Sequence, residues 1–461
     1  MRRAADAWHA RTITSVVDSA AVLIQPQANA RLNVIPRDQH CISRKNISDS
    51  ALKVMSRLRG EGYQAYLVGG AVRDLLLGGH PKDFDVATDA TPEAVHTLFR
   101  NSRVIGRRFR IVHVRFGREI IEVTTFRGHH DSDERSGAQP GDHRSRQSAS
   151  GRLLRDNVYG TLEEDAVRRD LTVNALYYDA GTFEVIDHVH GLADLERRSI
   201  CVIGEPGLRY REDPVRMLRV LRFAAKLGFD IDRDTAAAIP DCAQLLADIP
   251  AARLFDEFLK LFMAGCAAAT LELLLQHNLL RFLFPDTSDC LERDPAALAL
   301  VRAAMANTDQ RIAQDKPVTP AFILAALLWP VASARAQQRQ ECGEPAMLAM
   351  HNASQQSIAG AARHLSIPRR FSQPMREIWE YQLRLQRCHG RRAAELVDQR
   401  RFRAAYDFLL LREQAGEDTG QLGQWWTRFQ ELPLEQRLRE ASAKGKPGNR
   451  KTRTRRSRSA V

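Results

Sequence analysis

The sequence Leu67-Val68-Gly69-Gly70-Ala71-Val72-Arg73-Asp74 is followed closely by Lys82-Asp83-Phe84-Asp85-Val86. The apolar residues 65–68 predict a strand, which runs into a Gly-Gly turn and then into a short helix that reaches Leu77. In the second stretch two aspartates alternate with apolar residues, so in a strand both carboxylates point to one face. We therefore expect a phosphate-binding turn beside a pair of carboxylates.

Each part of this pattern has a chemical use. Gly69 and Gly70 leave backbone N–H groups free to approach phosphate oxygens, and Arg73 can add a guanidinium to the same anion. Asp83 and Asp85 are hard oxygen ligands of the kind that Mg²⁺ prefers together with substrate phosphates. A third carboxylate would allow two ions to stabilise the attacking and leaving oxygens of an in-line displacement.

Size and composition describe a folded protein with more than one core. The chain has 461 residues, 44% hydrophobic and 27% charged, which predicts two or more domains. No run of about 18 apolar residues is present, so we expect no membrane span. The seven cysteines are scattered singly, which indicates a reducing, cytoplasmic compartment. Residues 1–45 show no sustained periodicity and are predicted to be a poorly ordered leader.

The positive charge is concentrated at the C-terminus. The formal net charge is +12, and residues 441–461 hold eight Lys or Arg and no Asp or Glu. Such a segment predicts a disordered basic tail that binds a polyanion, with RNA as the natural partner. A tail that only improves solubility is the alternative.

The remaining patterns predict an α+β protein. An N-terminal mixed α/β head with a small antiparallel or mixed sheet is followed by helical segments from Asp213 to Phe429. Residues 127–152 are rich in Gly, Ser, His and Arg and are predicted to form a mobile loop. The other predicted elements are helices beginning at 48–49, 91–92 and 162, a hairpin of strands 111–116 and 120–123, and strands at 175–178 and 183–186.

Four stretches together carry a family resemblance. They are Val68-Gly69-Gly70-Ala71-Val72-Arg73-Asp74, Asp83-Phe84-Asp85, Arg168-Arg169-Asp170-Leu171-Thr172-Val173-Asn174 and Arg211-Glu212-Asp213-Pro214-Val215-Arg216-Met217-Leu218-Arg219. In order and spacing across residues 60–225 they resemble the class II nucleotidyltransferases, which include bacterial tRNA CCA-adding enzymes and bacterial poly(A) polymerase. The chain also resembles the poly(A) polymerase branch in particular at residues 98–101, 106–110, 126–130 and 402–407. The resemblance therefore covers about residues 46–430.

The resemblance implies the catalytic residues. Asp83 and Asp85 match the metal-binding aspartates, and Asp170 matches a third catalytic position of the polymerase branch. Glu122, on the predicted hairpin, is a rival third carboxylate because its strand would let it face the same cleft. Its alternative role is that of a charge on the strand surface.

The nucleotide-binding residues are implied in the same way. Gly69, Gly70, Arg73 and Arg169 match the region that holds the triphosphate. Four further residues form a polar stripe at i, i+3, i+6 and i+9, on the helix that reads the base in the family; they are Asp213, Arg216, Arg219 and Arg222. Without the surrounding motifs, a salt-bridged exposed helix face would be the better interpretation.

The base-reading chemistry leaves one choice open. The carboxylate of Asp213 can accept from an exocyclic amine while the guanidinium of Arg216 donates to the adjacent ring nitrogen. Adenine and cytosine present the same pattern of donor and acceptor. The two residues therefore account for rejection of uracil and guanine but do not decide between ATP and CTP.

The resemblance implies a division into functional regions. The expected regions are a leader at 1–45, a catalytic head at 46–203, a nucleotide-selecting helical neck at 204–285, an RNA-binding helical body at 286–440 and a basic tail at 441–461.

His113, His129 and His130 lack further ligands for a metal site and are predicted to contact nucleic acid or lie in a loop. Trp425 and Trp426 could stack on bases, but core packing is the preferred interpretation.

The implied activity is template-independent addition of AMP from ATP to RNA 3′ ends, with release of pyrophosphate. Two Mg²⁺ ions, or Mn²⁺ in their place, are expected at the aspartates, in a cytoplasmic monomer that promotes RNA decay and turnover. RNA-decay or RNA-chaperone proteins are candidate partners. The alternatives are CCA addition to tRNA and a non-catalytic RNA-binding protein on the same scaffold.

Overall fold

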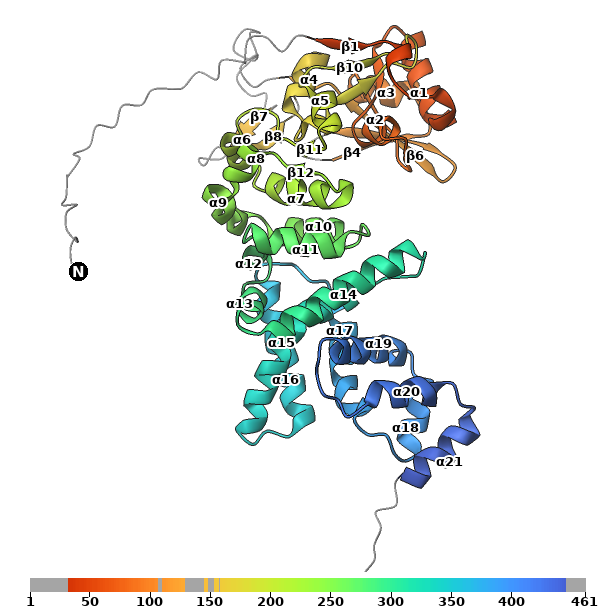
Figure 1. Ribbon diagram of the computed structural model, residues 1–461. Helices are drawn as coiled ribbons and strands as arrows, with labels where there is room; N and C mark the ends of the chain where they lie inside the picture. Colours follow the sequence, from red (N-terminus) through yellow and green to blue (C-terminus); the bar gives the residue numbers. More distant parts are fainter. Residues whose placement is uncertain (1–31, 107–109, 129–144, 148–152, 157, 445–461) are drawn as a thin grey trace, which may run out of the picture.

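The computed structural model describes residues 32–106, 110–128, 145–147, 153–156 and 158–444. These residues form an elongated molecule with a mixed α/β head at one end and a long stack of helices leading away from it (Figure 1). The predicted α+β class, with a head followed by helical regions, is confirmed.

The head is built on one mixed sheet of eight strands. Its order is β1-β10-β9-β2-β3-β6-β5-β4, and every neighbouring pair is antiparallel except β3 and β6, which are parallel. The strands are β1 (Asn33–Ile35), β2 (Ala65–Val68), β3 (Asp85–Thr88), β4 (Ser102–Ile105), β5 (Ile111–Phe116), β6 (Glu119–Thr125), β9 (Leu176–Tyr178) and β10 (Val185–Asp187). Two small pairs lie outside it: β7 (Ser145–Gln147) with β8 (Leu153–Asp156), and β11 (Ser199–Ile200) with β12 (Asp230–Ile231).

The two faces of the sheet have different surroundings. On the first face, side chains such as Val86, Val114 and Val123 pack in the main core against α1 (Asp49–Gly60) and α3 (Pro92–Leu98). On the second face, a small cluster of Val68, Ala87 and Tyr177 packs under Ala166 of α4 (Leu162–Arg168). The part of the second face over β4, β5 and β6 lies beyond this cluster and carries polar side chains.

Local sequence signals set the helix boundaries of the head. The Ser48 hydroxyl accepts from the N–H of Ser50 at the start of α1, and the Thr91 hydroxyl accepts from that of Ala94 in α3. Thr161 and Glu164 form a capping box at the start of α4. The short helix α2 (Gly70–Leu76) follows β2 directly, as the Gly-Gly pattern predicts. α5 (Gly191–Glu196) completes the head helices.

Helices dominate the chain after Ile203. The neck contains α6 (Pro206–Glu212), α7 (Val215–Leu227), α8 (Arg233–Ala237), α9 (Ile239–Cys242), α10 (Ala251–Phe262), α11 (Ala267–Gln276) and α12 (Leu280–Leu283). Beyond it lie α13 (Pro285–Arg293), α14 (Pro295–Ala313), α15 (Pro320–Glu341), α16 (Ala346–Ala362), α17 (Arg369–Leu385), α18 (Arg391–Leu396), α19 (Phe402–Gln414), α20 (Leu422–Gln430) and α21 (Leu434–Lys444). Short 3₁₀ helices occur at Arg37–Gln39, Arg44–Asn46, Thr172–Asn174 and Ala243–Asp248.

The apolar core is nearly continuous along the molecule. One cluster runs from the head through the neck to α17, and a second joins α17 to α21. Trp426 is fully buried in the second cluster, where its Nε1 donates to the carbonyl of Leu385 at 2.9 Å. Trp425 stacks on Phe429 with ring centroids 4.2 Å apart. The interpretation of this pair as core rather than base-stacking residues agrees with these contacts.

Three segments differ from the sequence-based expectation. Part of the predicted leader 1–45 is ordered: it contains β1, the 3₁₀ helix Arg37–Gln39 and the start of the 3₁₀ helix Arg44–Asn46. The edge strand β1 has only three residues, which is too short to show periodicity. Residues 145–147 of the predicted loop form β7, which pairs with β8. Residues 441–444 of the predicted tail continue α21, and Ala441 is buried. Residues 1–31, 129–144, 148–152 and 445–461 lie outside the described residues.

Two findings bear on the environment of the protein. Within the part of the chain that the structure describes, no helix has the length and apolar character needed to cross a membrane. All seven cysteines are free thiols, and they lie at separate places in the fold.

Candidate active site between the head and the neck

The Gly-Gly turn, a guanidinium and a carboxylate meet at one point. Gly69 lies between β2 and α2 with φ of 76°, a conformation that favours glycine. A Cβ on Gly69 would lie 3.8 Å from Nη1 of Arg169 and 4.0 Å from Oδ2 of Asp85. The register of β2 and β3 explains this closeness, because Val68 pairs directly with Asp85. Three predicted site residues from distant parts of the sequence are thus neighbours.

Asp85 is a mostly buried carboxylate with a raised pKa. Burial above all, together with Glu122 and Asp83, raises its pKa to about 6 against the opposing effect of Arg169. Glu122 is its direct cross-strand neighbour, since Asp85 of β3 pairs with Glu122 of β6. Asp83 is exposed and precedes β3 rather than lying within it, which differs from the expected strand over both aspartates.

The donor set fits a magnesium ion that shares its coordination with a substrate. Among the described residues, no three His, Cys, Asp or Glu side chains are close enough to form a complete metal cluster. Mg²⁺ is commonly bound through one or two carboxylates, with waters and substrate phosphates as the other ligands. Asp83 and Asp85, with Glu122 beside them, are consistent with such a site.

Asp170 is held by the neck. Nε of Arg216 donates to one carboxylate oxygen at 2.7 Å, and Arg219 forms an ion pair with the other. Burial alone would raise the pKa of Asp170, but Arg219 and Arg216 outweigh it and hold the pKa well below its usual range. Both carboxylate oxygens are therefore paired with guanidinium groups of α7. Glu122, not Asp170, is the carboxylate in register with Asp85.

Arg73 supports the Gly-Gly turn from inside the head. It is 1% exposed, and its Nε and Nη2 donate to Asp74 at 2.8 and 2.6 Å, while Nη1 donates to Asn174. Its guanidinium lies 5.2 Å from the ring centroid of Phe223 in α7. A Cβ on Gly70 would lie 3.4 Å from Nη2 of Arg73. Arg73 therefore links the turn to the neck.

Arg169 is aimed at the turn by a buried network. Its Nε and Nη2 donate to Asp165 at 3.1 and 2.9 Å, and Nε also donates to the hydroxyl of Tyr177 at 2.9 Å. The Tyr177 hydroxyl in turn donates to Asp165 at 2.6 Å. This leaves Nη1 of Arg169 as the nitrogen facing Gly69. Sequence reasoning missed Asp165 and Tyr177, although the i, i+4 spacing of Asp165 and Arg169 was a usable signal.

The predicted base-reading residues lie where α6 meets α7. Asp213 ends α6 and accepts from Arg253 of α10 at 2.6 Å, while its second oxygen is buried without a hydrogen-bond partner among the described residues. Arg216, besides Asp170, donates to Glu212 and to the carbonyl of Arg209, both at 2.8 Å. Sequence reasoning did not identify Arg253, which is 40 residues from Asp213.

Buried polar atoms without partners gather between α7 and α10. Nη2 of Arg219 lies 3.9 Å from Oε1 of Glu257, and the guanidinium of Arg222 lies 4.3 Å from the ring centroid of Phe223. Among the described residues, the unpartnered atoms in this region are Asp213 Oδ1, Arg219 Nε, Arg222 Nε, Arg253 Nη1 and Glu257 Oε2. Buried polar groups are normally paired, so this concentration is suited to a polar ligand.

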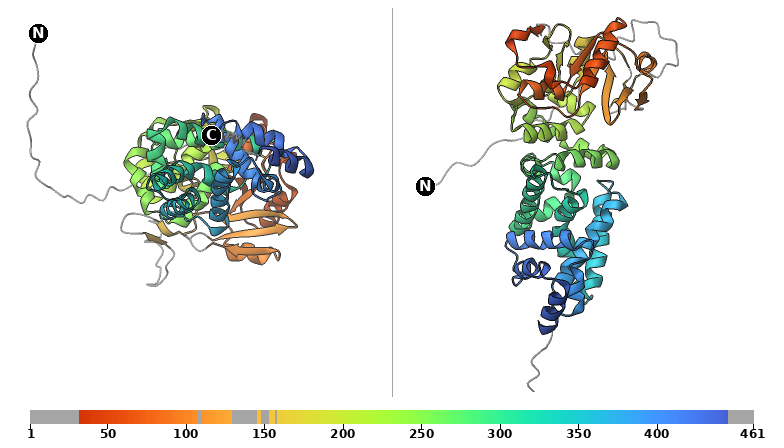
Figure 2. Two further views of the ribbon diagram at one scale, coloured as in Figure 1. Left: turned by 90° about the horizontal axis from the view of Figure 1, so that it is seen from below. Right: turned by 90° about the vertical axis from the view of Figure 1, so that its right-hand side faces the viewer.

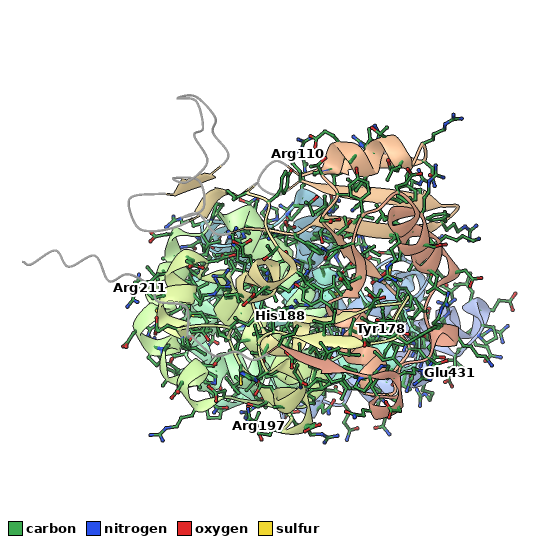
Figure 3. The ribbon with its side chains drawn as sticks, turned by 90° about the horizontal axis from the view of Figure 1, so that it is seen from above. Arg110, Tyr178, His188, Arg197, Arg211 and Glu431 are labelled. Atoms are coloured by element: carbon green, nitrogen blue, oxygen red, sulfur yellow. The ribbon has the colours of Figure 1, made fainter. Side chains whose placement is uncertain are left out.

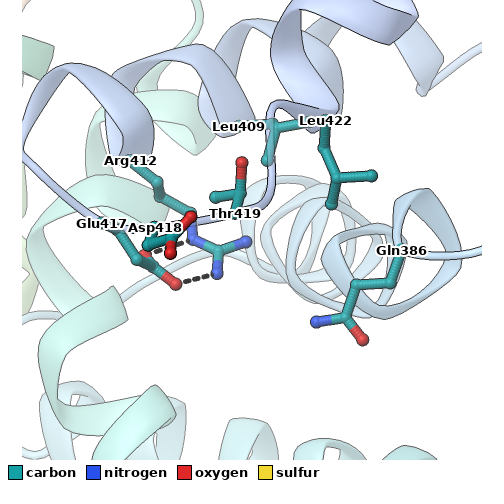
Figure 4. A pocket seen from close by; sticks show the side chains of 7 residues that line it. All are labelled: Gln386, Leu409, Arg412, Glu417, Asp418, Thr419 and Leu422. Carbon is teal, nitrogen blue, oxygen red and sulfur yellow. Dashed lines mark hydrogen bonds and ion pairs between the residues drawn. The ribbon is translucent and has the colours of Figure 1, made fainter.

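The other candidate residues lie elsewhere. His113 does not join a metal cluster; its Nε2 lies 3.1 Å from Oε1 of Glu122. His129 and His130 lie outside the described residues. A hollow in the body, shown in Figure 4, contains Arg412 paired with Glu417 and belongs to the α19–α20 region, far along the chain from the head. Figure 3 views the head from above, with Tyr178 of β9 and His188 labelled.

Comparison of the fold defines the class of protein. The chain shares the nucleotidyltransferase fold of CCA-adding enzymes. The Bacillus stearothermophilus CCA-adding enzyme in complex with CTP is 26% identical, with a TM-score of 0.51 and coverage of 85% of this chain and 82% of that one. Another CCA-adding enzyme complex with CTP is 19% identical, with a TM-score of 0.57 and coverage of 85% of each chain.

The sequence comparisons narrow the class to one family. Family models match a poly A polymerase head domain at residues 65–201, a probable RNA and SrmB-binding site of polymerase A at 228–291, and a polymerase A arginine-rich C-terminus at 342–460. Poly(A) polymerase I of Salmonella typhimurium is 47% identical over 439 residues, covering 94% of this chain and 93% of the relative. The chain belongs to the bacterial poly(A) polymerase I family.

Two further relatives differ in how much of the chain they match. Poly(A) polymerase I of Escherichia coli O157:H7 is 49% identical over 413 residues, covering 88% of this chain and 87% of the relative. The CCA-adding enzyme of Bacillus pumilus is 38% identical over 230 residues, which cover 50% of this chain and 53% of that enzyme. The similarity to poly(A) polymerase I therefore extends through the helical body. The similarity to this CCA-adding enzyme, in contrast, covers only half of the chain.

Proposed function

We propose that this chain is a template-independent poly(A) polymerase, which transfers AMP from ATP to the 3′-hydroxyl of RNA and releases pyrophosphate. The observation that carries the proposal is the meeting of Gly69, Arg169 and Asp85 at one point, in a chain of the poly(A) polymerase I family. Transfer of this kind requires positioning and charge neutralisation rather than covalent chemistry by the protein. An anion-binding turn and a guanidinium beside carboxylates provide both.

The carboxylates of the head would hold the metal. Asp83 and Asp85 are the proposed ligands of Mg²⁺, as two ions, with Mn²⁺ as an alternative. Glu122 is the preferred third carboxylate because it is in register with Asp85, whereas Asp170 is engaged by Arg216 and Arg219. When bound, Mg²⁺ supplies charge neutralisation and lowers the pKa of an attacking hydroxyl.

Different residues are proposed to bind the triphosphate and the base of the nucleotide. The backbone N–H of Gly70 and Nη1 of Arg169 are the proposed donors to the triphosphate, and Arg73 keeps the turn in place. The N–H of Gly69, which the sequence offered as a second donor, instead donates to the carbonyl of Leu176 at 3.3 Å. The unpartnered oxygen of Asp213 is positioned as an acceptor for an exocyclic amine, with Arg216 one helical turn away as donor. This pattern suits adenine and also cytosine, so ATP preference rests on the family relationship.

RNA and other partners are assigned to the helical part of the protein. The matches of residues 228–291 and 342–460 support RNA binding by the neck and the body, and SrmB as a candidate protein partner. We propose a head at 46–203, a neck at 204–285 and a body at 286–440, acting as a cytoplasmic monomer in RNA decay and turnover. RNA-decay and RNA-chaperone proteins belong to the same set of candidate partners.

The test of the activity is AMP incorporation into RNA by the wild type and Asp83→Ala. The wild type should extend a single-stranded RNA and release one pyrophosphate per AMP, and the variant should lose at least about 1,000-fold in kcat while binding RNA normally. Equal rates for the two proteins would remove Asp83 from the site. A wild type that binds RNA and releases no pyrophosphate would instead favour the non-catalytic RNA-binding alternative.

CCA addition is the second candidate, favoured by the partial match to the Bacillus pumilus enzyme. A tRNA that lacks its three terminal nucleotides separates the two activities. A CCA-adding enzyme stops after a defined three-nucleotide product when CTP and ATP are supplied. The proposed polymerase continues to add AMP and uses CTP poorly.

A further inference from the structure

A row of polar side chains crosses the open part of the second face of the head sheet. Asp85 on β3 is in register with Glu122 on β6, Glu122 with His113 on β5, and His113 with Arg103 on β4. Residues in register on neighbouring strands project from the same face. The row therefore begins at the proposed metal site and ends at the edge of the sheet, since β4 is the last strand.

The members of the row interact in sequence. His113 Nε2 lies 3.1 Å from Oε1 of Glu122, and their side chains are 25% and 46% exposed. The contact fixes one oxygen of Glu122, so the other is left for interactions near Asp85. Arg103 is exposed, and within the described residues its guanidinium forms no hydrogen bond or ion pair. A cation at the sheet edge is thus available to an anionic ligand.

The row lies on the side of Asp85 opposite to the proposed triphosphate site. Gly69 follows β2, the neighbour of β3 on one side, whereas Glu122 belongs to β6, the neighbour on the other side. Phosphoryl and nucleotidyl transfer place the attacking and leaving oxygens roughly in line, on opposite sides of the phosphorus. If pyrophosphate leaves toward Gly69, the attacking 3′-hydroxyl must arrive from the side of Glu122.

We propose that this row binds the 3′ end of the RNA: Arg103 binds a backbone phosphate near the terminus, and His113 positions Glu122 beside Asp85. The inference rests on the proposed function, because it assigns the second substrate of that reaction to a place in the head. Arg103 is a substrate-binding residue, and His113 is a positioning residue that acts through Glu122.

The dimensions and the flanking residues fit a short length of single-stranded RNA. Neighbouring strands are about 4.8 Å apart, so three steps separate Arg103 from Asp85 by about 14 Å between Cα atoms. Beside the row, Ile105 pairs with Ile111, and on its other flank Ile120 is 44% exposed. Guanidinium and apolar groups side by side match a strand of RNA, which has an anionic backbone and apolar ribose and base faces.

The first test compares Arg103→Ala with Arg118→Ala. Arg118 is an exposed arginine at the tip of the β5–β6 hairpin, and it lies outside the row that includes Arg103 of β4. Its replacement by alanine therefore removes the same charge without changing the row. Arg103→Ala should raise the KM for a short RNA about tenfold or more, while the KM for ATP stays unchanged. Arg118→Ala should change neither by more than about twofold. Equal effects of the two substitutions would reject the assigned phosphate site.

A chemical version of the test locates the phosphate. RNAs are prepared with one neutral methylphosphonate at each of the linkages nearest to the 3′ end. At one linkage the neutral group should raise the KM of the wild type and leave that of Arg103→Ala unchanged, because the two changes remove the same interaction. Additive effects at every linkage would contradict the interaction.

The positioning role of His113 has its own test. His113→Ala should lower kcat about tenfold with an unchanged KM for RNA, and His113→Gln, whose amide can donate to Glu122, should recover most of it. In the Glu122→Gln background, His113→Ala should have no further effect. A folded His113→Gln protein as slow as His113→Ala would overturn this role. A wild type without AMP incorporation would contradict the proposed function itself, whereas an active wild type with equal arginine variants contradicts only this inference.

Discussion

At the scale of single residues, Asp85 carries the strongest electrostatic signature of the site. Burial, Glu122 and Asp83 together raise its pKa to about 6. A buried carboxylate beside two others is unfavourable until a cation binds. A divalent ion at the proposed metal site would therefore relieve this repulsion and stabilise the head.

Asp85→Asn should stabilise the metal-free protein at neutral pH. Because the pKa of Asp85 is raised from 3.8 to about 6 on folding, the folded state is favoured by this group below about pH 4 and loses that advantage as pH rises through about 6. The gain from the substitution should thus grow from near zero at about pH 4 to about 2–3 kcal/mol at pH 8. The measurement is the thermal unfolding temperature of both proteins in EDTA across this range.

Magnesium provides the control for this prediction. Mg²⁺ should raise the unfolding temperature of the wild type and have a much smaller effect on Asp85→Asn. A variant that is less stable than the wild type at pH 8 in EDTA would contradict the account of Asp85.

Glu122→Gln and Asp170→Asn separate the two candidate third carboxylates. We expect Glu122→Gln to lower kcat at least about 100-fold and to weaken the dependence of the rate on Mg²⁺, because Glu122 is the neighbour of Asp85. Asp170→Asn should preserve the Mg²⁺ dependence and reduce nucleotide selectivity, because Asp170 fixes Arg216 and Arg219. Kinetics with varied Mg²⁺ and with ATP against UTP check both. The reverse pattern would restore Asp170 as the metal ligand.

At the scale of elements, helix α7 joins the proposed base-reading residues to the residues around the Gly-Gly turn. Its arginines hold Asp170, which follows Arg169 directly in the sequence, and its Phe223 lies against Arg73. The proposed base-reading helix thus contacts Asp170 and Arg73, which lie next to the proposed triphosphate site. A shift of α7 would therefore move the side chains that contact Arg73 and, through it, the Gly-Gly turn.

Arg216→Ala should relax the choice of base. The substitution removes the proposed donor to the ring nitrogen and a partner of Asp170, so the ratio of kcat/KM for ATP to that for UTP should fall about tenfold or more. Incorporation rates measured with each nucleotide separately are the appropriate measurement. Arg222→Ala, on the same helix two turns further on, is the comparison and should change this ratio less. An unaltered ratio in Arg216→Ala would count against base reading by α7.

Local patterns predicted several elements of the head. The strand before Gly69, the helix that begins after Thr91 and the β5–β6 hairpin were all visible as apolar periodicity and capping residues. Motif resemblance, rather than periodicity, supplied Asp170 and the residues of α7. The short edge strand β1 was not predicted, because three residues carry too little pattern.

Pairings between distant segments could not be predicted from local patterns. The partnership of Asp213 with Arg253 depends on how α10 packs against α7. Asp85 and Glu122 lie side by side because of the parallel register of β3 and β6, the only parallel pair in the described eight-stranded sheet. Sequence reasoning could name Glu122 as a rival carboxylate, but only the register places it beside Asp85.

At the scale of the whole molecule, the head and the helical regions form one extended body. Figure 2 shows the head at one end and the α17–α21 region at the other, with the neck between them. A single apolar core links head, neck and α17, so the elements are joined by packing rather than by loose linkers. This arrangement can hold RNA along the helical region while its 3′ end reaches the head.

Removal of residues 445–461 should weaken RNA binding without unfolding α21. The segment contains seven Lys or Arg and no Asp or Glu, which is the eight of residues 441–461 less Lys444. The affinity should fall, and the slope of log affinity against log salt should become shallower by up to about 0.7 for each RNA phosphate that the tail no longer neutralises. Fluorescence anisotropy with a labelled RNA at several salt concentrations measures both. An unchanged slope would show that the tail does not bind RNA.

Repeated transfer of AMP by the head to any accessible RNA 3′ end is the activity proposed for this protein. The most direct measurement is the length of the products formed on a short single-stranded RNA of arbitrary sequence, with each of the four nucleoside triphosphates supplied separately and Mg²⁺ present. A poly(A) polymerase should give a long ladder of products with ATP and little extension with CTP, GTP or UTP. No extension with ATP, or a product that stops after three nucleotides and only when CTP is also supplied, would contradict it.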